Sequence, residues 1–241
     1  MLAAGKQAGQ CTDGATAGER VADRGVVAGL GAVLLCGGRS SRMGRSKADL
    51  PFEGEPLVAR VAGRLLAVCS PVVVVAAPGQ ALPELPGAVA VVRDAVSGNG
   101  PLQGMLAGLG ALSGAAESVF VASTDAPFLH AEFVRRVEGL RREGDHDAVV
   151  PCAGGHWHVL SAAYRTGAVL PVVEELLARD VRRLGAIFER VRVRFVEEAE
   201  LLAGEALRGA DPGLRSLVNV NSPEDYELAL REGERGSGVW R

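Results

Sequence analysis

The stretch GAVLLCGGRSSRMGRSK, residues 31–47, decides the fold of this chain. Its first part, 31–36, is a short apolar run that ends at the pair Gly37-Gly38, which is typical of a buried strand followed by a tight turn. Glycines let a backbone approach a phosphate closely and aim N–H groups at it. Four basic residues follow the pair: Arg39, Arg42, Arg45 and Lys47. The stretch therefore predicts a first strand whose carboxyl end carries a phosphate-binding loop.

Two common phosphate-binding patterns do not match this loop. A Walker A loop needs Gly-Lys followed directly by Ser or Thr, whereas Gly44 is followed by Arg45-Ser46-Lys47. The dinucleotide fingerprint GxGxxG is absent, which makes an oxidoreductase with a dinucleotide cofactor the weakest of the functions considered. The composition alone also allows an ordinary glycine-rich turn with solvated basic residues.

Strands and helices alternate beyond the loop, which predicts an α/β fold with a mainly parallel sheet covered on both faces. The predicted strands cover 31–36, 72–75, 88–93, 118–123, 148–151, 158–164 and 191–196, and the predicted helices cover 56–68, 102–112, 131–142, 167–178 and 222–231. In such sheets ligands bind beyond the carboxyl ends of the strands. Gly37, Asp94 and Asp125 each follow a strand, so we expect them to converge at one edge.

The composition limits the class of protein. With 241 residues and 48% hydrophobic residues, the chain fits one domain, which we assign to 29–231 between a flexible leader (1–28) and a flexible tail (232–241). A net charge of −3 gives no general attraction to nucleic acid. The sequence has no apolar run near the roughly 18–20 residues that span a bilayer. Its four cysteines form no CxxC, which favours a reducing cytoplasm over a disulfide or zinc framework.

The loop has the pattern L-x-G-G-x-x-x-R-M-G-x-x-K, which resembles the signature of doubly wound, Rossmann-like nucleoside-triphosphate transferases. Within these the chain is most similar to the molybdenum cofactor guanylyltransferases. The resemblance implies a three-layer fold whose loop wraps the phosphates of GTP. It implies that Leu35, Cys36, Gly37 and Gly38 contact the nucleotide, and it gives Arg42 and Lys47 a catalytic role on phosphate charge.

A second segment follows the third predicted strand. Asp94 and then Gly100-Pro101-Leu102 resemble the family's D-x(4–6)-G-P-L pattern, which implies that Asp94, Gly100, Pro101 and Leu102 bind the nucleotide. A carboxylate at a strand end can accept hydrogen bonds from base or ribose, or help to order a metal. Asp94 taken alone could equally be a solvated turn residue.

A third segment follows the predicted strand 118–123, and it contains Asp125, the predicted metal ligand. An acid at the ligand edge suits Mg²⁺, which takes oxygen ligands and usually keeps waters and substrate phosphates. The run from Thr124 to Leu129 also resembles a family motif in which the Asp holds Mg²⁺, so the resemblance puts that catalytic role on Asp125. The alternative is that Asp125 caps the following helix.

The second half of the chain carries the predicted acceptor site. The run from His158 to Arg165 and the run from Val218 to Asp225 resemble family segments, which makes the acceptor-binding candidates His158, Arg182, Arg183, Asn219 and Asn221. Histidine and arginine can both donate to a phosphate. A strand histidine satisfied by backbone and a solvated helix face are the alternatives for His158 and for the two arginines. Ser222-Pro223 should start a helix.

These features together predict a Mg²⁺-dependent guanylyltransferase. It would join GMP from GTP to the terminal phosphate of molybdenum-molybdopterin, with molybdenum-insertion proteins and molybdoenzyme chaperones as partners. A CTP-using molybdopterin transferase, or another small-phosphate nucleotidyltransferase, remains an alternative, because Ala76-Ala77-Pro78 stands where many family members have a nucleotide-binding Asn. A non-catalytic NTP-binding protein with the same fold is the other alternative.

Overall fold

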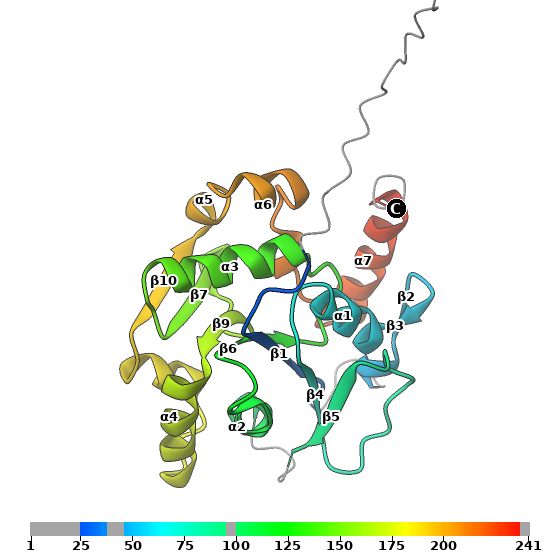
Figure 1. Ribbon diagram of the computed structural model, residues 1–241. Helices are drawn as coiled ribbons and strands as arrows, with labels where there is room; N and C mark the ends of the chain where they lie inside the picture. Colours follow the sequence, from blue (N-terminus) through cyan, green and yellow to red (C-terminus); the bar gives the residue numbers. More distant parts are fainter. Residues whose placement is uncertain (1–24, 38–45, 95–99, 237–241) are drawn as a thin grey trace, which may run out of the picture.

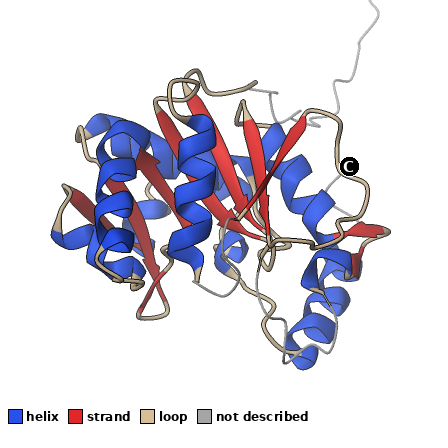
Figure 2. Cartoon of the chain, turned by 90° about the horizontal axis from the view of Figure 1, so that it is seen from below, coloured by secondary structure: helices blue, strands red, loops and turns tan. Residues whose placement is uncertain are grey.

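The chain folds as a central sheet between two layers of helices, as the computed structural model shows (Figures 1 and 2). The structure describes residues 25–37, 46–94 and 100–236. The sheet has eight strands in the order β10-β7-β9-β6-β1-β4-β5, with β8 paired to β7. Its strands are β1 (Leu30–Leu35), β4 (Val72–Ala76), β5 (Val89–Arg93), β6 (Ser118–Ser123), β7 (Ala148–Ala153), β8 (His156–Trp157), β9 (Ser161–Arg165) and β10 (Val193–Glu197).

Six of the eight strands point the same way. β1 is parallel to both β4 and β6, β4 to β5, and β7 to β10, whereas β9 is antiparallel to both of its neighbours, β6 and β7. The short β8 is also antiparallel to β7. The predicted three-layer, mainly parallel α/β fold is confirmed.

The two faces of the sheet bury different helices. The strand β1 shows the alternation: Ala32 and Leu34 join the core under α1 and α3, while Val33 and Leu35 join the core under α2 and α4. A Cβ on Gly108 would lie 2.4 Å from Cγ1 of Val33, so only glycine lets α2 approach the sheet this closely. The helices of these layers are α1 (Leu57–Leu66), α2 (Pro101–Leu112), α3 (Ala131–Glu143) and α4 (Thr166–Ala178).

A small third core lies beside the carboxyl end of β1. It packs Leu50, Phe52 and Leu57 against Val220 and Ala229. Leu50 follows the short helix η1 (Lys47–Asp49), Phe52 lies in β2 (Pro51–Phe52) of the hairpin with β3 (Glu55–Pro56), and Leu57 begins α1. Val220 precedes α7 (Pro223–Gly236), and Ala229 lies in it. This core joins the segment 50–57 to the last helix.

The structure corrects several predicted boundaries. The closing helix runs to Gly236 rather than ending at residue 231, and Val27, assigned to the leader, packs against the core and donates its N–H to Val68 O. The strand predicted from His158 begins at Ser161, because a turn separates it from β8. The short elements η1, η2 (Leu184–Glu189), η3 (Arg215–Leu217), α5 (Glu198–Leu201), α6 (Glu205–Ala210), β2, β3 and β8 were not predicted, since two to six residues show no clear periodicity. No helix in the described ranges has the length and apolar character needed to cross a bilayer.

Candidate functional site

The predicted site residues meet at the carboxyl edge of the sheet. Ser123, Leu35, Val75 and Val92 form one row across β6, β1, β4 and β5, each paired with its neighbour. Two residues further along each strand come Asp125, Gly37, Ala77 and Asp94, in that spatial order. The predicted convergence of Gly37, Asp94 and Asp125 is therefore confirmed.

Three predicted residues from distant parts of the chain come into contact beside β1. Lys47 Nζ lies 3.4 Å from Asp125 Oδ2 and donates to Asn221 Oδ1 at 3.0 Å. The side chains of Lys47 and Asp125 are 20% and 19% exposed, so both remain open to a ligand. The contact puts a cation, an anion and an amide on one spot of the edge.

Packing explains why these three residues meet. Lys47 is the first residue of η1. Ala48, the next residue, is buried in the core under α1 and α3, and Leu50, which follows η1, is buried in the third core. Asn221 follows Val220, which is buried in the same third core as Leu50 and donates its N–H to Asp125 O at 2.8 Å. Buried apolar residues thus lie next to Lys47 and Asn221 in the sequence, and their packing fixes the positions of these two polar side chains.

The immediate partners of Asp125 fit an oxygen-rich ion site. Ser123 Oγ donates a short hydrogen bond to Asp125 Oδ1. The helix after this segment starts at Ala131 with His130 as its cap, so Asp125 is not the cap of α3. Among the described residues there is no cluster of three or more His, Cys, Asp or Glu able to hold a metal. One carboxylate beside a hydroxyl and an amide suits a cation that completes its shell with substrate phosphates and water.

Asp94 lies at the opposite end of the same edge. Its N–H donates to Ala76 O at 2.8 Å, which continues the ladder between β4 and β5. Three strand spacings separate β5 from β6, about 14 Å in total. Asp94 and Asp125 are therefore suited to two ends of one elongated ligand rather than to one metal ion.

The Gly-Pro-Leu segment forms the start of α2 next to Asp94. Gly100 has φ +79°, a left-handed conformation that favours glycine, and Pro101 is the first helical residue. Leu102 is fully buried under the sheet. Their roles in binding a nucleotide stay predictions, and Leu102 would act by packing.

The backbone at the end of β1 is partly occupied by side chains that were not predicted. Leu35 O accepts from both the N–H and the Oγ1 of Thr124, at 3.1 and 3.0 Å. Gln80 Nε2 donates to Cys36 O at 3.2 Å. Cys36 is half-buried, and burial raises the pKa of its thiol, which suits a packing role. No sequence pattern pointed to Thr124 or Gln80, because their contacts depend on the order of the strands.

His158 lies at the carboxyl edge, in the turn between β8 and β9. Burial lowers the pKa of this histidine, and a hydrogen bond to the backbone of Ala153 only partly opposes that shift. The neutral form of the ring is therefore favoured. The pair of His156 and His158 joins no metal cluster among the described residues.

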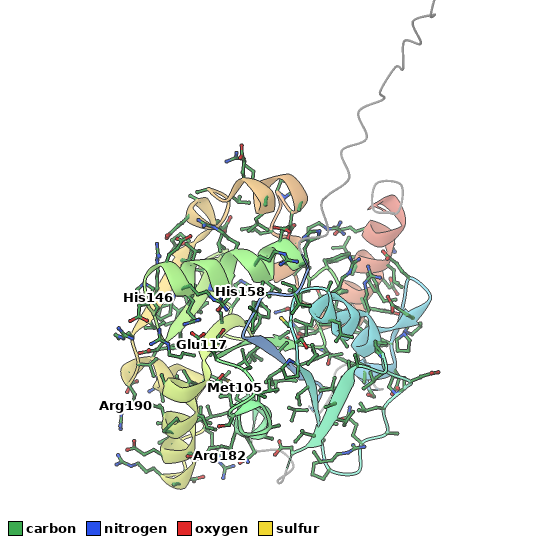
Figure 3. All side chains as sticks on the ribbon, viewed as in Figure 1. Met105, Glu117, His146, His158, Arg182 and Arg190 are labelled. Atoms are coloured by element: carbon green, nitrogen blue, oxygen red, sulfur yellow. The ribbon has the colours of Figure 1, made fainter. Side chains whose placement is uncertain are left out.

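The remaining acceptor candidates differ in exposure. Arg182 and Arg183 follow α4, are exposed, and pair with Asp180 and Glu189 at 2.7 Å each rather than lying on a helix face. Figure 3 shows Arg182 well apart from His158. Asn219 Oδ1 is buried and has no hydrogen-bond partner among the described residues, which is unusual for a buried oxygen.

The remaining predictions for this edge concern the loops and the last helix. Gly38 and Arg42 lie outside the described residues. The predicted start of α7 is confirmed, since Ser222 Oγ accepts from Asp225 N–H at 3.1 Å. Asp225 in turn accepts from the N–H groups of Asn221 and Ser222, which holds the pKa of its carboxyl below the usual value. These bonds fix the backbone of Asn221.

The sequence matches a family model described as "MobA-like NTP transferase domain" over residues 32–195. A protein of Mycobacterium tuberculosis (strain H37Rv) named "Probable molybdenum cofactor guanylyltransferase" is 36% identical over 207 residues, which cover 85% of this chain and 94% of that protein. A protein of the same name from Mycobacterium avium is 34% identical over 199 residues, which cover 81% of this chain and 92% of its own length.

Solved structures show the same fold. Molybdopterin-guanine dinucleotide biosynthesis protein A from Archaeoglobus fulgidus superposes with a TM-score of 0.65 at 24% identity, over 85% of this chain and 98% of that one. The 2-C-methyl-D-erythritol 4-phosphate cytidylyltransferase from Thermus thermophilus gives a TM-score of 0.55 at 18% identity, over 85% and 99% of the two chains.

Proposed function

The chain belongs to the MobA-like NTP transferase family, and on that basis we propose that it transfers GMP from GTP to the terminal phosphate of molybdenum-molybdopterin. The products would be molybdopterin guanine dinucleotide and pyrophosphate. The observation that carries the proposal is the contact of Lys47, Asp125 and Asn221 at the carboxyl edge of the sheet. The curated relatives named as guanylyltransferases favour GTP over CTP.

The reaction needs positioning and charge neutralisation more than acid–base chemistry. An oxygen of the acceptor phosphate attacks the α-phosphorus in line and forms a new P–O bond. The bond from the α-phosphorus to the bridging oxygen breaks, and pyrophosphate leaves with the electron pair. The acceptor phosphate is already ionised at neutral pH, so no protein nucleophile or general base is required.

Each residue of the edge has a proposed part in that step. Lys47 neutralises charge on the phosphates, together with Arg42. Asp94 and the Gly100–Leu102 segment hold the nucleoside end, since they follow β5, three strands from Asp125. His158, Asn219 and Asn221 orient the acceptor. Arg182 and Arg183 could reach the acceptor only by leaving their pairs with Asp180 and Glu189.

Asp125 is the proposed ligand of Mg²⁺. Ser123 Oγ, which bonds to Asp125, and Asn221 Oδ1, which shares Lys47 with it, are oxygen atoms of the kind this ion prefers. A bound Mg²⁺ would supply charge neutralisation on the phosphate oxygens. Asp125 would exchange its long contact with Lys47 for the ion, which frees the lysine for phosphate.

Pyrophosphate release with each nucleotide tests the proposal. Purified protein is incubated with Mg²⁺, with GTP, CTP or ATP, and with or without molybdenum-molybdopterin. We expect pyrophosphate and dinucleotide with GTP and acceptor together. Turnover with CTP but not GTP would replace the guanylyl assignment by a cytidylyl one. Tight NTP binding without any product would instead favour the non-catalytic alternative.

The cellular setting is part of the proposal. The three described cysteines, Cys36, Cys69 and Cys152, are free thiols, which is consistent with a cytoplasmic enzyme. Molybdenum-insertion proteins would supply the acceptor, and molybdoenzyme chaperones would receive the product.

A further inference from the structure

The turn after β4 lies between the two segments that would hold the nucleoside. β4 is flanked by β1 and β5 in the sheet. Cys36 and Gly37 follow β1, and Asp94 follows β5. A nucleoside held from both sides must therefore lie over the end of β4, where residues 77–80 form a turn.

Gln80 links the two strand ends under that position. Its Oε1 accepts from Ala77 N–H at 2.9 Å, and its Nε2 donates to Cys36 O at 3.2 Å. The same Nε2 lies 3.6 Å from the Cys36 sulfur. The side-chain amide thus has both of its ends engaged, which fixes its orientation.

Arg93 fastens the turn from the side of β5. Its Nη1 donates to Ala77 O at 3.1 Å and makes a short hydrogen bond to Gln80 O. Gln80 N–H also donates to Ala77 O at 3.1 Å. Gln80 is therefore held at its backbone as well as at its side chain, and Arg93 directly precedes Asp94.

The carbonyl that Gln80 touches is suited to reading a base. A carbonyl oxygen has two lone pairs, and Thr124 occupies both on Leu35 O. Among the described residues, Gln80 is the donor to Cys36 O, which leaves one lone pair for a ligand donor. Guanine presents N–H donors at N1 and N2, whereas adenine presents an acceptor at N1. A carbonyl aimed by Gln80 would favour guanine.

We propose that Gln80 is a positioning residue that sets the preference for guanine by fixing the Cys36 carbonyl at the base end of the site. This inference rests on the proposed function, because it takes the carboxyl edge as the nucleotide site. Gln80 acts on the nucleotide only by orienting the Cys36 carbonyl, and its own side-chain amide does not contact the base.

Binding of GTP, ITP and ATP in the absence of acceptor tests the inference. We expect Gln80→Ala to weaken GTP binding about tenfold, as for the loss of one good hydrogen bond, and to leave ATP binding almost unchanged. ITP lacks the 2-amino group, so its affinity should change less than that of GTP. Gln80→Glu keeps the acceptor for Ala77 N–H and loses the donor to Cys36 O, so it should also lose the preference for GTP. Glu84→Ala, an exposed residue of the same connection, is the matched control and should bind all three nucleotides like the wild type.

The outcomes separate the possible failures. Equal weakening of all three nucleotides in both Gln80 variants, or no weakening of GTP, would overturn the role of Gln80. If Gln80→Ala does not fold, the selectivity of Gln80→Glu decides alone. A wild-type protein that binds no NTP would instead remove the proposed function. If the wild type binds GTP and the Gln80 variants bind it equally well, only the role of Gln80 is contradicted, and the proposed function stands.

Discussion

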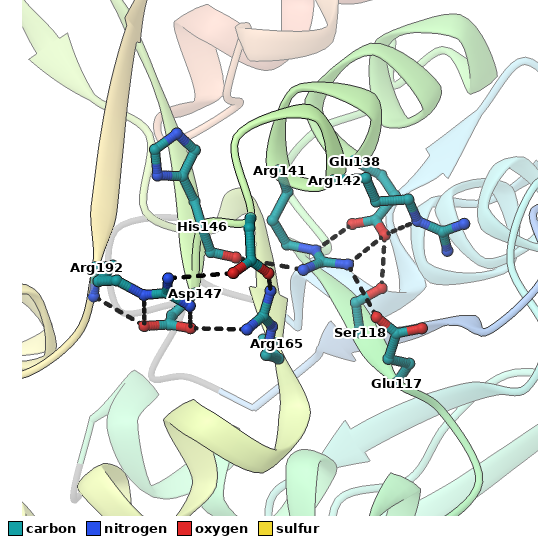
Figure 4. A network of polar contacts seen from close by, with 10 residues as sticks. Glu117, Ser118, Glu138, Arg141, Arg142, His146, Asp147, Arg165 and Arg192 are labelled. Atoms are coloured by element: carbon teal, nitrogen blue, oxygen red, sulfur yellow. Dashed lines mark hydrogen bonds and ion pairs between the residues drawn. The ribbon is translucent and has the colours of Figure 1, made fainter.

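Charged side chains lie at both ends of the strands of the central sheet, but they are paired closely at the amino edge and more loosely at the carboxyl edge. At the amino edge, Glu138 and Arg141 are each 1% exposed, and they pair at 2.8 Å (Figure 4). Arg142 and Ser118 donate to the same carboxylate at 2.6 and 2.8 Å. A second group there, made of Asp145, Asp147, Arg165 and Arg192, is also fully interlinked.

The carboxyl edge has the same kinds of side chain in a looser arrangement. Lys47 and Asp125 are about one fifth exposed and lie 3.4 Å apart. Close and mutually satisfied charges indicate a structural role, whereas longer contacts leave bonding capacity for a ligand. Substitutions at the two edges should therefore affect different properties.

The largest effect should come from Asp125→Asn. The amide keeps the size of the side chain and removes the charge proposed to hold the ion. We expect kcat to fall about 100- to 1,000-fold, with little change in Tm. The same change at the other edge, Asp145→Asn on an exposed carboxylate, should leave kcat unchanged. Intact activity in Asp125→Asn would show that the metal assignment is wrong.

Glu138→Ala should lower the stability of the protein and leave its kcat unchanged. It removes the close partner of the buried Arg141 and leaves, among the described residues, only the longer contacts to Glu117 at 3.6 Å and to His146 O at 3.3 Å, which costs about 3 kcal/mol of the free energy of unfolding. Urea denaturation measures the loss, and the exposed Glu143→Ala on the same helix is the control. Activity per folded molecule should stay at the wild-type level. A comparable fall in kcat per folded molecule would contradict the separation of the two edges.

Lys47→Ala should reduce kcat/KM for GTP by about 30- to 100-fold, or roughly 2–3 kcal/mol, because a charge-assisted contact to phosphate is lost. Steady-state kinetics at saturating acceptor measure it. Lys47→Arg keeps the charge on a longer side chain and should recover part of the activity. An arginine variant as impaired as the alanine variant would argue that Lys47 acts by its contact with Asn221 alone.

The smallest expected effect concerns pH and His158. Because burial lowers the pKa of His158, the folded protein takes up this proton only below the ordinary value of about 6.5. The charged ring attracts an anionic acceptor, so the apparent KM for acceptor should fall about threefold between pH 7 and pH 5.5 relative to His158→Gln. The variant corrects for titration of the acceptor itself. Parallel KM profiles for the two proteins would exclude His158 from the acceptor site.

The strand ends could be predicted from sequence because each is marked by a local change. An apolar run stops at Gly37, Asp94 or Asp125, and parallel strands place such ends on one edge. The sequence predicts a phosphate role for Lys47, a metal role for Asp125 and an acceptor role for Asn221, but not that the three side chains meet. Residues 47 and 221 meet through the third core, whose hairpin strands of two residues have no detectable period.

Other parts of the site depend on which strands are neighbours. Thr124 saturates Leu35 O only because β6 lies next to β1, and Gln80 reaches Cys36 only because β4 lies on the other side. The strand that became β9 was predicted, but its antiparallel direction was not, since strand direction leaves no mark in an apolar run. The charge network at the amino edge involves Arg141 and Glu138, which are three residues apart on a helix and look like a solvated pair in sequence.

A crystal structure of the protein with GTP and Mg²⁺ tests the central claim most directly. The account predicts the triphosphate beside Lys47 and Asp125, and the guanine over residues 77–80 between Cys36 and Asp94. Nucleotide bound away from the carboxyl edge, or bound there with its triphosphate at Asp94 and its base at Asp125, would contradict it.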